Sequence, residues 1–185
     1  MELIGPYLVG SLLLVIAGVA KAIEPADTAR ALVPLLRLPI GVLQPLIRVG
    51  AAGEAVLGAL ALLWPGEVTA GLVGLSYLVF CGVVVYARKV GGPLATCGCF
   101  GTPDTPATGL HLVVNLALLV SAVAVATDAR RGWLWTQLAG QPAHGVALLL
   151  ASAVATWLAY LVLVALARLE AVRADVGIEH RKAVS

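Results

Sequence analysis

Hydrophobic residues gather in five long runs along the chain, separated by shorter stretches that carry most of the charged residues. The runs cover about residues 4–23, 49–64, 68–87, 109–127 and 144–167, and each is long enough, or nearly so, to cross about 30 Å of hydrocarbon. Glu2 makes the first run begin with an acidic residue, whereas secretory signals begin with basic ones, so we expect this run to be retained as a helix. The pattern therefore predicts five transmembrane helices.

Three of the connections have recognisable patterns of their own. Within residues 24–48, the stretch at about 28–38 has the polar and apolar periodicity of a helix and is closed by Pro39, which predicts an amphipathic helix along the membrane surface. Residues 64–67, which read Trp-Pro-Gly-Glu, predict a tight turn between the second and third spans. Residues 128–142 include two tryptophans, which predicts a loop anchored at the membrane surface.

The composition supports the same conclusion and excludes two classes of protein. Hydrophobic residues make up 61% of the chain, charged residues 12%, and the mean hydropathy is +1.00. Soluble domains carry about 25% charged residues, so a soluble fold is excluded. The net charge of +2 comes without a dense basic tract, so nucleic-acid binding has no support. We expect an all-α polytopic membrane bundle, a single domain over 1–185 with a charged tail over 168–185.

The basic residues are distributed unequally between the two sides of such a bundle. With five spans, the segment 24–48, the segment 88–108 and the tail share one side. Basic residues near membrane surfaces mark the cytoplasmic side, so this side is expected to be cytoplasmic in a plasma-membrane protein whose N-terminus lies outside. That side carries Arg30, Arg37, Arg48, Arg88, Lys89, Arg168, Arg173, Arg181 and Lys182, against Arg130 and Arg131 on the other.

Small residues recur at helical spacing in the second span. Ala51, Ala55 and Ala59 follow one another at intervals of four, and Gly58 lies beside them. Small side chains let the backbones of two membrane helices approach closely. We therefore expect this helix to pack tightly against a neighbour.

Four polar side chains within the spans fall towards one end of the predicted bundle. Lys21 is near the end of the first span, Glu54 near the start of the second, and His111 and Asn115 lie one turn apart near the start of the fourth. A charge inside a membrane is costly and is usually paired, which predicts an ion pair between Lys21 and Glu54. A purely structural clamp and a catalytic role are both open for this pair.

The connection between the third and fourth spans contains two cysteines one residue apart, in the sequence Cys97-Gly98-Cys99. Glycine tolerates the unusual dihedral angles that a small, strained disulfide between them requires. Strain makes a disulfide easier to reduce, whereas a structural disulfide stabilises most when it closes a long loop. The pattern therefore favours a site of dithiol–disulfide exchange.

Two alternatives remain open for these cysteines. Cys97, Cys99 and His111, with Cys81 as a further ligand, could hold a metal, although structural zinc sites more often use a two-residue gap. Both cysteines could also be unreactive loop thiols. Cys81, on the third span, is typical of a small buried apolar residue.

A reactive cysteine must ionise, because the thiolate is the attacking species. Nearby cations and the N-terminus of a helix favour the thiolate. Arg88, Lys89, His111 and the start of the fourth span are the candidates for this supporting role.

These features together resemble the MauE branch of the DoxX-like membrane proteins, over roughly the first 120 residues. The resemblance implies a four-helix core, here followed by a fifth C-terminal transmembrane helix. The matching positions are Lys21-Ala22 followed by Pro25, the amphipathic stretch with Pro39, Gly53-Glu54, and Cys97-Gly98-Cys99-Phe100-Gly101.

The resemblance implies a redox-associated membrane protein that works beside a thioredoxin-like partner on the disulfides of an exported enzyme. Cys97 and Cys99 would cycle between dithiol and disulfide, passing electrons to or from that partner and to or from a membrane quinone. No attachment motif for haem is present. The alternatives are a non-catalytic accessory subunit that binds other membrane subunits, and a transporter built around Lys21 and Glu54, which lacks the internal repeat of many transporters.

The expected side of the cysteine segment conflicts with this implied role. Disulfides of exported proteins form on the outer side, whereas the basic residues place the segment inside. A segment folded back into the bundle and reachable from both sides would reconcile the two, because irregular backbone is tolerated at depth where protein covers it.

Overall fold

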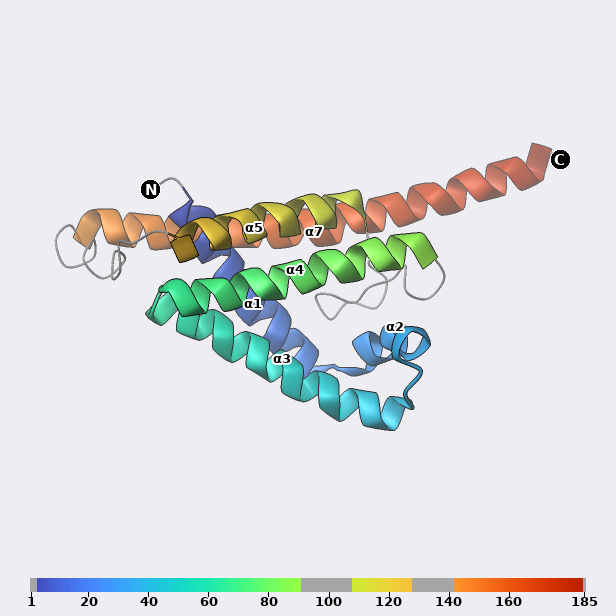
Figure 1. Ribbon diagram of the computed structural model, residues 1–185. Coiled ribbons are helices and arrows are strands. Elements are labelled where there is room, and N and C mark those ends of the chain that lie inside the picture. The colour runs from blue at the N-terminus through green and yellow to red at the C-terminus, as the bar shows by residue number, and fades with distance from the viewer. Residues whose placement is uncertain (1–2, 91–107, 128–141, 185) are drawn as a thin grey trace.

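The computed structural model describes residues 3–90, 108–127 and 142–184, and these residues form helices joined by short connections (Figure 1). Five of the helices are long and apolar enough to cross a membrane. The predicted all-α, polytopic membrane bundle is therefore confirmed. The helices are α1 (Ile4–Ile23), α2 (Ala26–Leu36), α3 (Ile40–Leu63), α4 (Glu67–Val90), α5 (Gly109–Thr127) and α7 (Pro142–Val184).

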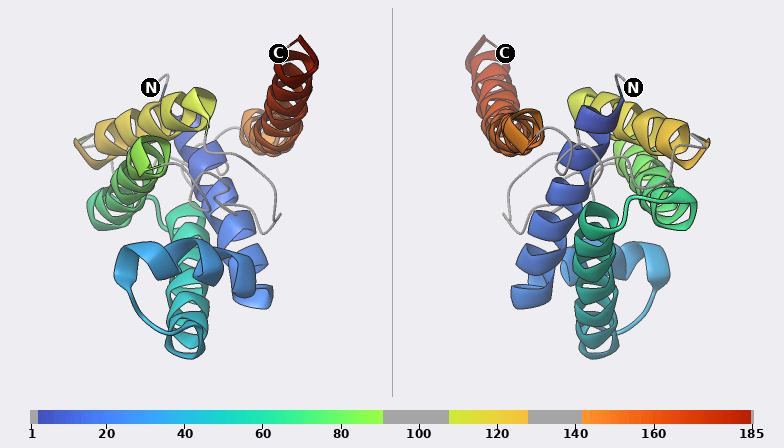
Figure 2. Two further views of the ribbon diagram at one scale, coloured as in Figure 1. Left: turned by 90° about the vertical axis from the view of Figure 1, so that its right-hand side faces the viewer. Right: turned by 90° about the vertical axis from the view of Figure 1, so that its left-hand side faces the viewer.

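The five long helices run alternately in opposite directions. Helices α1, α4 and α7 run one way and α3 and α5 the other, while the short α2 lies at the end of the bundle where α1 and α4 finish (Figures 1 and 2). This end also holds the start of α5. The ends of α1 and α4 and the starts of α3 and α5 therefore lie on one side of the molecule.

Helix α3 begins at Ile40, nine residues before the expected span at 49, and so includes a charged residue, Arg48. The helix begins directly after Pro39, which is its N-cap residue and has an extended backbone conformation (ψ 144°). Arg48 is accommodated because its Nε donates a hydrogen bond to the carbonyl oxygen of Ala22, at 3.0 Å. The last carbonyls of a helix have no partner within that helix, so Arg48 closes the end of α1.

Helix α2 occupies most of the stretch expected to be amphipathic and packs against two other helices. Ala31 is buried against Ala87, in the last turns of α4. The helix ends where Arg37 adopts the left-handed conformation (φ 52°), from which its N–H donates to the carbonyl of Val33 at 2.8 Å. This conformation is the usual way to end a helix but is costly for a residue other than glycine.

Helices α1 and α3 approach each other closely at two glycines. A Cβ atom on Gly18 would lie 2.6 Å from the carbonyl oxygen of Ala51, and one on Gly58 would lie 2.6 Å from that of Ser11. Real side-chain atoms cannot occupy either position without moving the backbone. The tight packing expected of the small residues in this span is therefore present, and it holds α1 against α3.

The hydrophobic core lies in the half of the bundle that contains the turn at 64–67. Tyr77 is buried there, packs its ring nearly perpendicular to that of Phe80, and donates a hydrogen bond from its hydroxyl to the carbonyl oxygen of Gly10 at 2.6 Å. The turn itself is held by Thr69, whose hydroxyl accepts from the Gly66 N–H and donates to the Trp64 carbonyl. The core cluster consists of Tyr7, Leu13, Leu14, Ala61, Ala70, Val73, Tyr77, Leu118 and Ala122.

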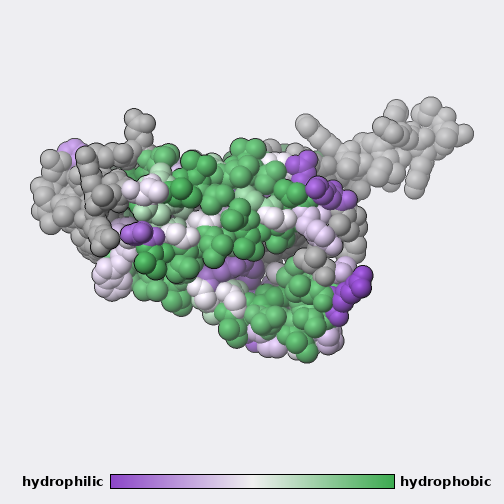
Figure 3. All heavy atoms as spheres, in the orientation of Figure 1, coloured by the Kyte–Doolittle hydropathy of each residue, from purple (hydrophilic) through white to green (hydrophobic). Residues whose placement is uncertain are grey.

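The face of the bundle that Figure 3 draws is predominantly hydrophobic over its described residues. Large apolar side chains are exposed along α3, α4, α5 and α7, among them Val49, Val68, Val113 and Leu150. A soluble protein does not expose apolar surface on this scale, whereas lipid tails would cover it. The fold is thus that of a protein surrounded by a lipid bilayer.

Candidate functional site

A cavity of about 290 Å³ lies in the half of the bundle opposite the 64–67 turn. Its walls come from α1, α2, α3, α4 and α5, with Leu163 of α7 completing them. Most of the lining is apolar, and the polar residues in it include four that the sequence singled out. These four are Lys21, Glu54, His111 and Asn115.

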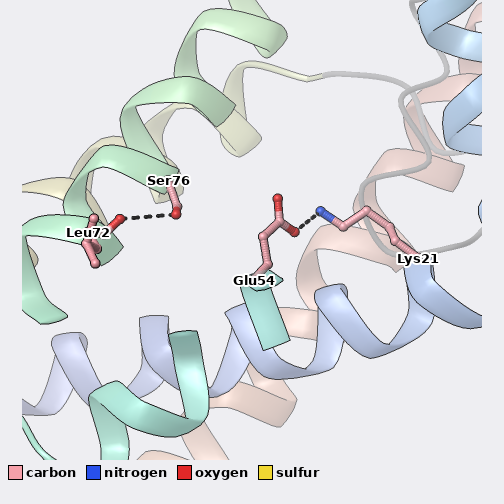
Figure 4. Close-up of polar contacts among 4 residues, drawn as sticks. All are labelled: Lys21, Glu54, Leu72 and Ser76. Atoms are coloured by element: carbon pink, nitrogen blue, oxygen red, sulfur yellow. Dashed lines mark hydrogen bonds and ion pairs between the residues drawn. The ribbon is translucent and has the colours of Figure 1, made fainter. Parts of the chain in front are cut away.

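Lys21 and Glu54 form the predicted ion pair across the α1–α3 interface (Figure 4). The side chain of Lys21 is 9% exposed and that of Glu54 is 24% exposed, so the lysine is the more deeply buried partner. The pairing follows from the close approach of the two helices, because Gly18 lies one turn before Lys21 and Ala51 one turn before Glu54. The two charges neutralise each other inside a membrane-spanning segment, where an unpaired charge is costly.

An aromatic ring from a third helix also contacts the lysine. The Nζ atom of Lys21 lies 4.9 Å from the centre of the Phe80 ring, within the range of a cation–π interaction. Phe80 is in turn held edge-on by Tyr77, with the ring centres 5.7 Å apart. The ammonium group is therefore positioned by a carboxylate from α3 and a ring from α4, both at the cavity wall.

His111 and Thr108 close the first turn of α5 on the same side of the bundle. The Nδ1 atom of His111 accepts a hydrogen bond from the backbone N–H of Thr108 and lies 3.0 Å from the Thr108 hydroxyl. In a capping box, the side chain of the third helical residue accepts a hydrogen bond from the backbone N–H of the N-cap residue, and His111 and Thr108 have this arrangement. This contact fixes the imidazole of His111, which is buried and lines the cavity.

Arg88 brings a permanent positive charge to the junction of α4 and α5. Its guanidinium lies against Gly109, where a Cβ atom would be 3.0 Å from Nη1. Lys89 follows it in the last turn of α4, and both side chains are exposed. Cations at the end of a helix also interact favourably with its dipole.

The cysteines fall into two groups. Cys81 is a free thiol on α4 that is buried to 6% exposure and is not part of the cavity wall, in keeping with the expected small apolar residue. Cys97 and Cys99 lie outside the described residues, so their exchange or metal-binding role stays a prediction. Within the described ranges, no group of three or more His, Cys, Asp or Glu residues is arranged to hold a metal.

Three residues of the site were missed by the sequence analysis. Tyr77 and Phe80 are ordinary aromatic residues in an apolar span, and nothing in the sequence shows that Phe80 contacts Lys21 or that Tyr77 packs against Phe80. Thr108 could have been recognised, because a threonine three residues before a possible acceptor at the start of an apolar run is a capping signal.

Among known protein families, the model for the methylamine utilisation protein MauE matches residues 2–128 of the chain. No curated protein and no solved structure matches the chain. The matched range contains α1 to α5, and so includes every residue of the candidate site described in this subsection except Leu163 of α7. The chain is a multi-pass membrane protein that belongs to the MauE family.

Proposed function

We propose that this MauE-family protein is a membrane thiol–disulfide redox protein that exchanges a Cys97–Cys99 disulfide with a thioredoxin-like partner. In the exchange, a thiolate attacks the disulfide of the other protein and forms a mixed disulfide, which the second cysteine then resolves. One dithiol is oxidised to a disulfide and the other disulfide is reduced to a dithiol, so two electrons and two protons are transferred. The reaction runs in the direction set by the two reduction potentials.

The observation that carries the proposal is the charge at the two points where the cysteine segment is attached. Cys97 follows Val90, the last residue of α4, by seven residues, which span at most about 25 Å, so Arg88 and Lys89 lie within the reach of this length of chain. Arg88 also contacts Gly109, the first residue of α5. Cations and a helix N-terminus both favour a thiolate, so the positive groups at the two attachment points support the proposal.

The test is to trap the mixed disulfide with single cysteine variants. Cys97→Ser and Cys99→Ser are each incubated with a thioredoxin whose own resolving cysteine is replaced by serine and which carries an activated disulfide. One of the two variants is expected to give a stable adduct on a non-reducing gel, because its remaining thiol attacks but nothing resolves the product.

Cys81→Ser is the matched control, since it removes a buried thiol away from the cavity wall and leaves the proposed pair intact. It should behave as the unaltered protein does. Absence of an adduct from both single variants, together with maleimide labelling that reductant does not change, would refute the exchange function.

The proposed orientation can be measured in the same preparation. We propose, from the basic residues, that the cysteine segment faces the cytoplasm. A membrane-impermeant maleimide should then label Cys97 and Cys99 only in opened cells. Labelling in intact cells would place the segment on the outer side instead.

A further inference from the structure

Helices α3 and α4 form adjacent walls of the cavity on a side of the bundle that faces the position of the lipid. These two helices meet at the 64–67 turn and diverge towards the end of the bundle that holds the cavity (Figure 1). Hydrophilic side chains are visible between them, surrounded by hydrophobic surface (Figure 3). Glu54, on the cavity wall, keeps 24% of its side chain exposed, as expected at an opening. A ligand that enters here comes from the hydrocarbon of the membrane.

The polar groups of the cavity define the head group that such a ligand needs. Lys21 and Glu54 cancel each other's charge, so a neutral head group avoids an unpaired charge at this depth. The structure shows no hydrogen bond between Asn115 and any other described residue, although its amide lies on the cavity wall inside a membrane span. An amide without a partner in hydrocarbon is costly, so Asn115 is available to donate to a carbonyl oxygen.

The size and lining of the cavity favour a ring. Small-molecule sites occupy about 300–1,000 Å³, so a volume of about 290 Å³ accommodates one substituted ring but not a whole phospholipid. Tyr77 and Phe80 provide aromatic surface, and Leu14, Val83 and Val114 are among the apolar residues that complete the walls.

We infer that this cavity, lined by Lys21, Glu54, Phe80, His111 and Asn115, is a binding site for the head group of a lipid-soluble quinone, with the apolar tail leaving between α3 and α4 into the bilayer. The neutral ring carries two carbonyl oxygens, which match the amide of Asn115 and the ammonium of Lys21. The binding is independent of the cysteines. Only its redox use rests on the proposed function: oxidation of the Cys97–Cys99 dithiol releases the two electrons and two protons that convert a quinone to its quinol.

Two glycines of α3 give a matched test of the site. Gly50 lines the cavity and Gly53 does not, and for both the position of a Cβ atom has nothing within 4 Å. The first side-chain atom added at either position therefore meets no neighbour, but only Gly50→Leu adds a side chain at a residue that lines the cavity. Binding of decylubiquinone is measured by calorimetry on each purified variant in lipid nanodiscs.

Gly50→Leu is expected to weaken decylubiquinone binding by about tenfold or more, and Gly53→Leu by less than about twofold, because only the first occupies ligand volume. Asn115→Leu should weaken it by about three- to tenfold, the effect of one lost hydrogen bond. Equal binding by the two glycine variants, or displacement of decylubiquinone by an equal concentration of stearic acid, would overturn the inference.

The cysteine variants separate this inference from the proposed function. The Cys97→Ser/Cys99→Ser double variant should bind decylubiquinone as the unaltered protein does. Thiol exchange without quinone binding refutes the cavity assignment alone, whereas quinone binding without thiol exchange refutes the exchange function alone.

Discussion

Helix α1 contributes to two regions that differ in how their polar side chains are hydrogen-bonded or paired. In the core end, which is the cluster around Tyr7, Leu13, Val73, Tyr77 and Leu118, the bundle is filled with side chains. In the cavity end, defined by Lys21, Glu54, Phe80, His111 and Asn115, the same helices surround a space.

Three hydroxyl groups of the core end donate to backbone carbonyls, while the buried hydroxyl of Tyr7 has no hydrogen-bond partner among the described residues. Ser11 donates to the carbonyl of Tyr7, Ser121 to that of Leu118, and Tyr77 to that of Gly10. Among the described residues, the two charges of the cavity end, Lys21 and Glu54, pair with each other across two helices, and Phe80 of a third helix contacts the lysine. A hydroxyl group in the core end can therefore be explained by helix packing alone. The cavity end instead places several polar side chains around one space, and polar side chains inside a membrane span usually indicate a functional region.

The largest expected effect comes from breaking the ion pair of the cavity end. Lys21→Met or Glu54→Gln should each lower the unfolding free energy by about 3 kcal/mol, because the remaining partner is left without its counter-charge inside the bundle. The double variant should cost less than the sum of the two. Unfolding in mixed micelles with rising dodecyl sulfate measures these values.

Asp27→Asn is the control for this comparison. It breaks the ion pair of Asp27 with Arg30, whose side chain is largely exposed, and should cost less than about 1 kcal/mol. If the Lys21 and Glu54 variants cost no more than this control, the pair does not distinguish the cavity end.

A somewhat smaller effect is expected from the two glycines that hold α1 against α3. Gly58→Ala, beside Ser11, and Gly18→Ala, beside Ala51, should each cost about 2 kcal/mol, because the added carbon meets backbone atoms. Gly53→Ala, with open space around it, should be neutral or slightly stabilising. The same unfolding assay measures these values. If Gly18→Ala leaves the unfolding free energy unchanged while Gly58→Ala lowers it, the helices can move apart at the cavity end but not at the core end.

Tyr77 lies where the two regions meet, and its hydroxyl tests the core end. Tyr77→Phe removes the hydrogen bond to the Gly10 carbonyl and should cost about 1 kcal/mol. Ser76→Ala, next to it, removes an exposed hydroxyl that bonds within its own helix and should change stability by less than about 0.5 kcal/mol. Equal effects of the two substitutions would contradict the assignment of Tyr77 to the packed core.

The smallest expected effect is a gain in stability. Glycine adopts the left-handed conformation of Arg37 without strain, so Arg37→Gly should stabilise the protein by about 0.5 kcal/mol after the added freedom of the unfolded chain is deducted. Because α2 lines only the cavity end, slower hydrogen exchange should be confined to α2 and its neighbours. Arg30→Gly, within α2, should have the opposite effect. Faster exchange in Arg37→Gly would show that the cap is not strained.

Sequence reasoning predicted the helical class and the pairing of Lys21 with Glu54, because hydropathy and the cost of buried charge are local properties. It did not predict the start of α3 at Ile40, since Arg48 ends the apolar run while its guanidinium reaches the carbonyl end of another helix. The contact of Lys21 with Phe80 likewise depends on how α4 crosses α1. The cavity depends on the divergence of α3 and α4, and the angle between two helices cannot be predicted from the residues of either helix alone.

The close approach at Gly18 and Gly58 has a consequence for how ligand preference could change during evolution or design. Because the backbones of α1 and α3 are already in contact, this side of the cavity acts as a wall whose position substitutions cannot adjust without separating the helices. A larger or smaller ligand must therefore be accommodated from the opposite side. Val83 of α4 and Val114 of α5 line the cavity away from the α1–α3 contact, so substitutions at these two positions change the cavity volume without separating α1 from α3.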